Sequence, residues 1–230
     1  MNELNEMQKQ DELKLINLIG EIRGIGRRIN EPIEIEYQDL SINRQAPKHK
    51  KLVPLSEIND LNHLRHLKLT HKVLVPLLLK YLHEFRTINF KNLVVNALKV
   101  KGFYDATETL INEFNTTDLI DSYKWSIGDA FSIILDERYE DEYIKIVKNI
   151  KNGTSRQMVT IALGKLKSDK AIPVLISLLD DEEVNGHVVI ALGYYKKPEF
   201  RKYIEPFLTH KKAWIRAQAK AAIKKLDKVG

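Results

Sequence analysis

Trp125 and Asp129 form the pair of residues in this sequence whose chemistry is easiest to name. They stand one turn apart on a predicted helix, so the indole and the carboxylate are expected to project from the same side of it. An indole offers a flat apolar surface with one N–H donor, and a carboxylate accepts hydrogen bonds or stabilises positive charge. The pair fits an anchor for a partner protein, or one wall of a site for a planar base.

Other motifs that could perform chemistry are missing. The sequence has no phosphate-binding loop, dinucleotide-binding fingerprint, nucleophile elbow or His-Glu-x-x-His zinc motif. Without cysteine it can form no disulfide framework, thiolate nucleophile or cysteine-based zinc site. His63, His66 and His71 lack an accompanying carboxylate pattern, which favours surface or capping positions over a metal site. We therefore predict no catalytic residue, no metal and no cofactor.

A basic stripe with a four-residue spacing lies near the C-terminus. Its members are Lys212, Arg216, Lys220 and Lys224. Residues 196–230 contain eleven Lys or Arg and three acids, a net charge of +8, whereas the rest of the chain carries −2. Such a stripe could follow the phosphates of a nucleic acid by charge alone. The alternative is a solvated outer face, because the end of a repeat array must present polar residues to water.

The elements that would position these residues are helices that recur along the chain. A small-large pair repeats at intervals of 29 to 33 residues, as Ala97-Leu98, Ala130-Phe131, Ala162-Leu163, Ala191-Leu192 and Ala222-Ile223. With mostly apolar residues three and seven positions earlier, each pair forms one helical stripe. Each stripe follows another predicted helix, over Val73–Phe85, Asp105–Phe114, Asp141–Ile150, Ala171–Leu179 and Phe200–Leu208. The small alanines would let the paired helix approach closely.

One stretch of this pattern resembles a known family. The run from Ala162 to Asp181, followed by Ala191-Leu192-Gly193, resembles HEAT repeats of the phycobilisome-lyase-like kind. That resemblance implies a right-handed α-solenoid, an armadillo-like helical superhelix. In that family a basic residue stands six positions before the alanine of the second helix. The corresponding residues here are Lys91, Lys124, Arg156, Asn185 and Arg216, of which Asn185 departs from the pattern.

The resemblance also implies roles for charged residues. The basic residues of that family usually pair with acids near the end of a first helix and tie neighbouring repeats together. The acids placed to do this are Asp118, Asp121, Asp180 and Asp181. Separately, the Trp125 and Asp129 pair is similar to one in HEAT-like alkylpurine DNA glycosylases, where a second Trp and an Arg complete the site around a damaged base. That resemblance implies Trp214 as the second Trp and Arg156 or Arg216 as the Arg.

Residues 1–71 do not follow the repeat, and we interpret them as a cap on a solenoid of residues 72–230. Apolar spacing predicts a helix over Asp11–Ile29, and alternation over residues 33–38 predicts a half-buried strand. The basic, proline-containing residues 43–54 are predicted to form a loop, and Ser56 is the candidate N-cap of a helix over Ser56–Leu69. The alternative is a separate recognition element.

The composition, with 43% hydrophobic and 30% charged residues, is typical of a soluble globular protein. No apolar run is long enough to cross a bilayer and no secretory signal is visible, so we expect a cytoplasmic protein without membrane contact. We predict an all-α solenoid of about five HEAT-like hairpins, working as a non-catalytic scaffold that holds a protein partner in its concave groove. The groove candidates are Tyr123, Trp125, Asp129, Gln157 and His187.

Two alternatives to this function stay open. The first is nucleic-acid binding through the basic stripe, which includes a glycosylase-like enzyme. The second rests on family analogy and is a lyase-like or chaperone-like role toward another protein.

Overall fold

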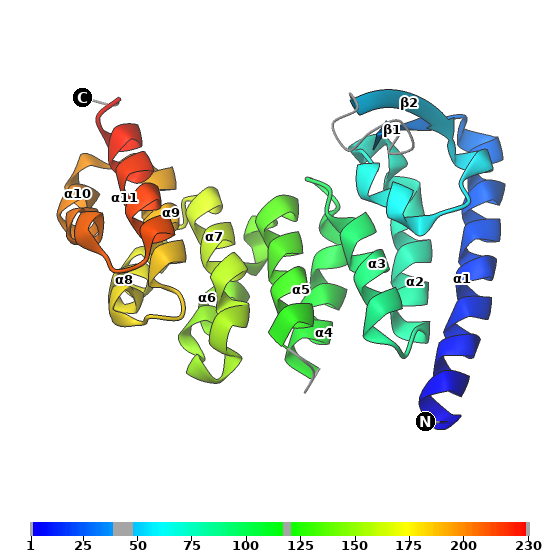
Figure 1. The fold of residues 1–230 in the computed structure, drawn as a ribbon, viewed down its shortest axis with the longest axis horizontal. Helices are drawn as coiled ribbons and strands as arrows, with labels where there is room; N and C mark the ends of the chain where they lie inside the picture. The colour runs from blue at the N-terminus through cyan, green and yellow to red at the C-terminus, as the bar shows by residue number, and fades with distance from the viewer. Residues whose placement is uncertain (1, 39–47, 117–120, 229–230) are drawn as a thin grey trace. The chain divides into compact units, whose positions relative to one another are not determined.

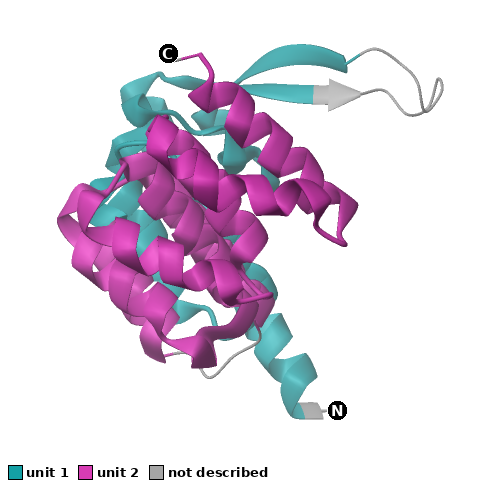
Figure 2. Cartoon of the chain, turned by 90° about the vertical axis from the view of Figure 1, so that its left-hand side faces the viewer, with its two compact units in different colours: residues 1–106 teal, residues 107–230 magenta. Residues whose placement is uncertain are grey.

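The computed structural model describes residues 2–38, 48–116 and 121–228. These residues are predominantly helical, and the sheet among them has two strands (Figure 1). The prediction of an all-α class is therefore confirmed. The chain divides into two compact units, residues 1–106 and residues 107–230 (Figure 2). Residues 72–106, which the sequence groups with the repeats, belong to the first unit.

The first unit begins with a long helix and continues through a hairpin into shorter helices. Its longer elements are α1 (Asn2–Ile29), β1 (Pro32–Gln38), β2 (Lys48–Pro54), α2 (Val75–Glu84) and α3 (Ile88–Leu98). Helix α1 buries Leu18 and Ile22, four residues apart, so one stripe faces the core. At Gly26 the chain passes so close that an added Cβ would lie 2.5 Å from the backbone nitrogen of Ser56. Only glycine fits at that crossing.

The sequence predicts one of the two strands of the β-hairpin. In β1 the side chains of Ile33 and Ile35 are buried while those of Glu34 and Glu36 are not, as the alternation indicates. The predicted loop is wrong over residues 48–54, which form β2 antiparallel to β1, and residues 43–47 lie outside the described part. The three lysines, the histidine and Leu52 of β2 are all exposed, so this strand shows no alternation of buried and exposed side chains. Backbone pairing and cross-strand ion pairs stabilise β2 instead.

The helix predicted over Ser56–Leu69 is also wrong. The chain forms short 3₁₀ segments there, Leu55–Glu57 and Leu61–His66, followed by Leu69–Leu74. The cap of the second segment is Asp60, whose carboxylate accepts a hydrogen bond from the N–H of Asn62 at 2.8 Å. Extended backbone at Ile58 separates the first two segments. Apolar side chains in both turns are buried nonetheless, which is why their spacing resembles that of a helix.

A buried carboxylate ties α1 to the start of α3. Oδ2 of Asp11 accepts hydrogen bonds from the N–H of Arg86 at 3.0 Å and from the N–H and hydroxyl of Thr87 at 2.8 and 2.9 Å. Thr87 is the N-cap of α3, so Asp11 satisfies the N–H of the N-cap residue and of the residue before it, neither of which has a partner within the helix. Burial acts to raise the pKa of Asp11, but these hydrogen bonds and Lys14 together hold that pKa below its usual value.

The described residues of the second unit, 107–116 and 121–228, form four helix pairs. In each pair a first helix, often completed by a 3₁₀ turn, precedes a longer second helix. The first helices are α4 (Thr107–Thr116), α6 (Glu140–Lys148), α8 (Ile172–Ser177) and α10 (Arg201–Ile204). The second helices are α5 (Asp121–Ile134), α7 (Arg156–Leu166), α9 (Asn185–Tyr195) and α11 (Ala213–Leu226). Each second helix packs on the next, α5 on α7, α7 on α9 and α9 on α11.

Small residues set the spacing between these second helices. A Cβ added to Gly164 of α7 would lie 2.6 Å from the Cβ of Ala191 in α9, and one added to Gly193 of α9 would lie 2.8 Å from the Cβ of Ala222 in α11. The recurring alanines are indeed buried. Ala191 and Ala222 therefore make room for the preceding second helix, a neighbour that the sequence interpretation, which considered the paired first helix, did not name.

The second helices run parallel to one another. Between α7 and α9, Gln157 contacts Glu183, two residues before α9 begins, and Gly164 contacts Ala191 farther along both helices. Between α9 and α11, Gly186 meets Trp214 and Gly193 meets Ala222 in the same order. Their N-terminal turns consequently share one edge of the unit, and their C-terminal turns share the opposite edge.

Candidate binding surface

The N-terminal edge of the second helices carries both tryptophans of the chain. Trp125 in α5 is 37% exposed and Trp214 in α11 is 44% exposed. We call the surface made by Trp125, Gln157, His187 and Trp214 the tryptophan edge. Large, partly exposed aromatic side chains on one edge are the type of residue that dominates protein interfaces.

Trp125 is held by a neighbouring helix. Its Nε1–H donates to Oε1 of Gln157 at 3.1 Å, and Nε2 of Gln157 donates to the backbone carbonyl of Glu183 at 2.8 Å. These two bonds connect α5, α7 and the segment that precedes α9. The indole is thereby oriented while more than a third of it stays open to solvent.

Trp214 is held by packing. Its ring lies 5.5 Å from the ring of His187, centroid to centroid, and it covers Gly186, where any side chain would overlap the indole. Burial lowers the pKa of His187 to about 4, so the imidazole is neutral at neutral pH. Sequence reasoning missed Gly186, although it occupies the same position in its helix relative to the recurring alanine as Trp125.

Tyr123 does not belong to this surface, which corrects its place among the groove candidates. It is completely buried, and its hydroxyl donates to Oε1 of Glu113 at 3.1 Å. Burial, and then the charge and hydrogen bond of Glu113, raise the pKa of Tyr123 far above its usual range. The position seven residues before Ala130 is part of the apolar stripe, and that position faces the core.

Asp129 is half-buried and contacts a polar cluster between α5 and α7. The hydroxyl of Ser132 lies 3.5 Å from its Oδ1, and Nζ of Lys165 donates to the backbone carbonyl of Ser132 at 2.8 Å. Burial lowers the pKa of Lys165, and the charge of Asp129 opposes that change. The carboxylate is thus engaged beside Lys165.

Arg156 is a structural residue. It is only 1% exposed, with Nη1 2.7 Å from Oδ2 of Asp181 and Nη2 3.0 Å from Oε2 of Glu183. Its Nε also donates to the carbonyl of Gly153 at 2.9 Å. The expected pairing with Asp181 is confirmed. Asp180 forms no such pair among the described residues, Asp121 accepts a bond from Ser155 through its backbone carbonyl, and Asp118 lies outside the described part.

The basic stripe is only partly continuous on the surface. Lys212, Lys220 and Lys224 are exposed. Arg216 is half-buried and uses its Nη1 to donate to the backbone carbonyls of His210 and Lys211, at 2.8 and 3.0 Å. Three cations therefore face water, while the fourth fixes the turn that leads into α11.

The histidine cluster has a structural role at one position. His71 is buried, and its Nδ1 accepts a hydrogen bond from the N–H of Lys68 at 2.9 Å. Within residues 2–38, 48–116 and 121–228, no group of three or more His, Asp or Glu side chains is arranged to hold a metal ion. In that same part of the chain, every helix is too short or too polar to cross a bilayer.

Comparison with known proteins adds no family to this description. No protein-family model matches the sequence, and no curated protein matches it.

Proposed function

We propose that this chain is a non-catalytic binding scaffold, a HEAT-like α-solenoid that holds a protein partner at the tryptophan edge. Four parallel second helices in regular succession, spaced by glycine and alanine, support the solenoid. In such a solenoid the second helices line the concave groove, and the partner would lie there. Asp129 adds a half-buried carboxylate to the same helix as Trp125.

The observation that carries the proposal is the fixed, partly exposed state of both tryptophans. Each indole is oriented by a neighbouring helix, Trp125 through Gln157 and Trp214 through Gly186 and His187. A side chain that is already ordered loses little conformational entropy on binding, so more of its contact energy appears as affinity. Tryptophan is also enriched among the residues that contribute most to protein interfaces.

The test compares affinity enrichment from the native host by the unmodified protein and by two variants. Trp125→Ala/Trp214→Ala removes both anchors, and Ile150→Ala removes an apolar side chain that is 73% exposed elsewhere in the same unit. A true partner should be lost with the double variant and kept with the control. Purified, it should bind the single variant Trp125→Ala at least about thirtyfold more weakly, equivalent to about 2 kcal/mol. Equal capture by all three proteins would refute the proposal.

Nucleic-acid binding through the exposed Lys212, Lys220 and Lys224 is the alternative. If it operates, duplex affinity should fall steeply as salt rises, because each phosphate contact releases counterions. Replacing the three lysines by Gln should then flatten that dependence. The glycosylase-like form lacks a free arginine at the described site, since Arg156 is buried in ion pairs and Arg216 bonds to backbone carbonyls. We expect no release of alkylated bases, with Asp129→Asn as the control.

A further inference from the structure

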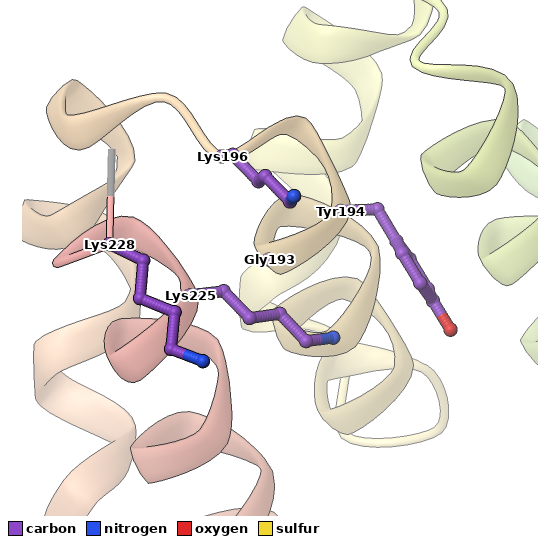
Figure 3. A pocket seen from close by; sticks show the side chains of 5 residues that line it. All are labelled: Gly193, Tyr194, Lys196, Lys225 and Lys228. Atoms are coloured by element: carbon purple, nitrogen blue, oxygen red, sulfur yellow. The ribbon is translucent and has the colours of Figure 1, made fainter.

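A second feature lies at the opposite ends of the same helices. A cavity of about 320 Å³ is lined by Gly193, Tyr194, Lys196, Lys225 and Lys228 (Figure 3). Gly193 and Tyr194 belong to the last turn of α9, and Lys196 follows that helix directly. Lys225 lies in the last turn of α11, and Lys228 follows two residues after that helix ends. Figure 3 shows the side chains of Lys196 and Lys225 both extending toward the side on which Tyr194 lies.

The packing of α9 on α11 explains why a space exists there. Gly193 has no side chain to occupy it, and an added Cβ would lie 2.8 Å from the Cβ of Ala222. The small pair lets the helices touch through their backbones. Long side chains on the flanking positions then stand around the contact and leave a hollow between them.

The lysines around this cavity differ from basic residues close by in the chain. Lys197 pairs with Asp169 at 2.9 Å, and Arg201 pairs with Glu205 and Asp227. By contrast, Lys196, Lys225 and Lys228 form no ion pair with any acid among the described residues. Nζ of Lys225 lies 4.5 Å from the centre of the Tyr194 ring, which places that ammonium against the cavity wall.

The charge of the site remains positive after the helix ends are counted. Lysines often stand at helix C-termini, where the backbone carbonyls carry a partial negative charge of roughly half a unit per helix. Two helix ends therefore offset only about one of the three ammonium charges. Three like charges around one hollow repel one another, and an anion between them would remove that repulsion.

The ligand class follows from charge and volume. Lysine binds phosphate as a point charge, without the planar geometry that arginine requires. A volume of about 320 Å³ is at the lower end of small-molecule pockets, which suits a compact ligand. We infer that this cavity binds the phosphate groups of a small polyphosphorylated molecule between Lys196, Lys225 and Lys228. This site is separate from the tryptophan edge and independent of the proposed scaffold function.

Isothermal titration calorimetry with inorganic tripolyphosphate tests the site on the full chain. The variant Lys196→Gln/Lys225→Gln/Lys228→Gln should weaken binding by about tenfold or more, because it removes every charge-assisted contact. The matched control is Lys212→Gln/Lys220→Gln/Lys224→Gln, which removes the same charge from the same region outside the cavity. Its affinity should change by less than about twofold, as expected for screened surface charges. Circular dichroism melting curves establish that both variants fold.

Three results would overturn the inference. Equal weakening by both triple variants would show diffuse attraction by net charge. Equal binding of sulfate at matched ionic strength would show a site without preference for polyphosphate. No heat of binding and no amide chemical-shift change near Tyr194 at millimolar tripolyphosphate would show that the lysines are only solvated helix ends.

Discussion

Asp11 and Thr87 are 76 positions apart in the sequence, and yet the carboxylate of the first caps the helix that the second begins, with Oδ2 accepting the Thr87 N–H at 2.8 Å. The same oxygen accepts the Thr87 hydroxyl at 2.9 Å. The carboxylate of α1 thus accepts the N–H of the N-cap residue itself, a role that the Glu or Gln of a capping box normally fills from within the same helix. One buried carboxylate therefore joins α1 to the start of α3.

Asp11→Ala should lower the free energy of unfolding by about 2 kcal/mol, because the part-buried N–H groups of Arg86 and Thr87 and the Thr87 hydroxyl lose their acceptor. Chemical denaturation followed by circular dichroism measures the change. Glu12→Ala, an exposed neighbour on the same helix, is the control and should shift stability by less than about 0.5 kcal/mol. Equal effects of both substitutions would contradict the capping role.

Acid should destabilise the protein partly through Asp11. Its pKa in the folded state lies below the usual value, so its contribution to stability is present above the unfolded pKa, about 3.9. That contribution is lost as the pH falls through the folded pKa. Asp11→Asn cannot titrate, and its unfolding free energy should therefore fall less steeply with acid than that of the unmodified protein. Superimposable profiles from denaturation at several pH values would exclude this role.

The contacts between second helices should tolerate no added volume. Gly164→Ala puts a Cβ 2.6 Å from the Cβ of Ala191, and we expect a loss of about 1–3 kcal/mol through overpacking. Ala162→Leu and Ala191→Leu should act in the same direction, with damage spreading to adjacent helix pairs. Thermal melting is the measurement.

Gly20→Ala is the matched control for these overpacking variants. An added Cβ at Gly20 meets nothing within 4 Å. The same chemical change should therefore stabilise α1 by about 0.5–1 kcal/mol, because alanine is the better helix former. If Gly164→Ala were as stable as Gly20→Ala, the close approach of α7 and α9 would be wrong.

Arg156→Lys should destabilise the second unit although it keeps the charge. Lysine cannot reach Asp181, Glu183 and the Gly153 carbonyl together, since it lacks the planar fork of the guanidinium. We expect a loss of about 2 kcal/mol or more in denaturation experiments. Lys148→Arg, on an exposed position of α6, should be neutral. An unchanged midpoint for Arg156→Lys would show that the buried ion pairs contribute little.

The sequence predicts the second helices well for a physical reason. Ala130, Ala162, Ala191 and Ala222 are buried at recurring positions, so packing and pattern coincide. Strand β2 was missed because its side chains are mostly exposed, and it is held by backbone pairing and by ion pairs with β1 rather than by burial. The helix predicted over Ser56–Leu69 failed because buried leucines can also be spaced by 3₁₀ turns.

Among the candidate site residues too, the repeat pattern could predict some positions and not others. Trp125 and Gln157 could be proposed because their place relative to the recurring alanines puts them off the core stripe. Tyr123 is on that stripe, and its burial follows from the rule that predicted the helix. The cavity of Lys196, Lys225 and Lys228 has no local signal, since its lysines come from two different helix ends and meet only through the contact of Gly193 with Ala222.

The tryptophan edge contains both indoles of the protein, and the emission spectrum of the unmodified chain therefore comes from that edge alone. A bound partner that covered it would shift this emission to shorter wavelength without any attached dye. Replacing one indole by phenylalanine would leave the other as a single reporter, Trp125 for the α5 end or Trp214 for the α11 end. The order in which a partner reaches the two ends could then be followed by stopped-flow fluorescence.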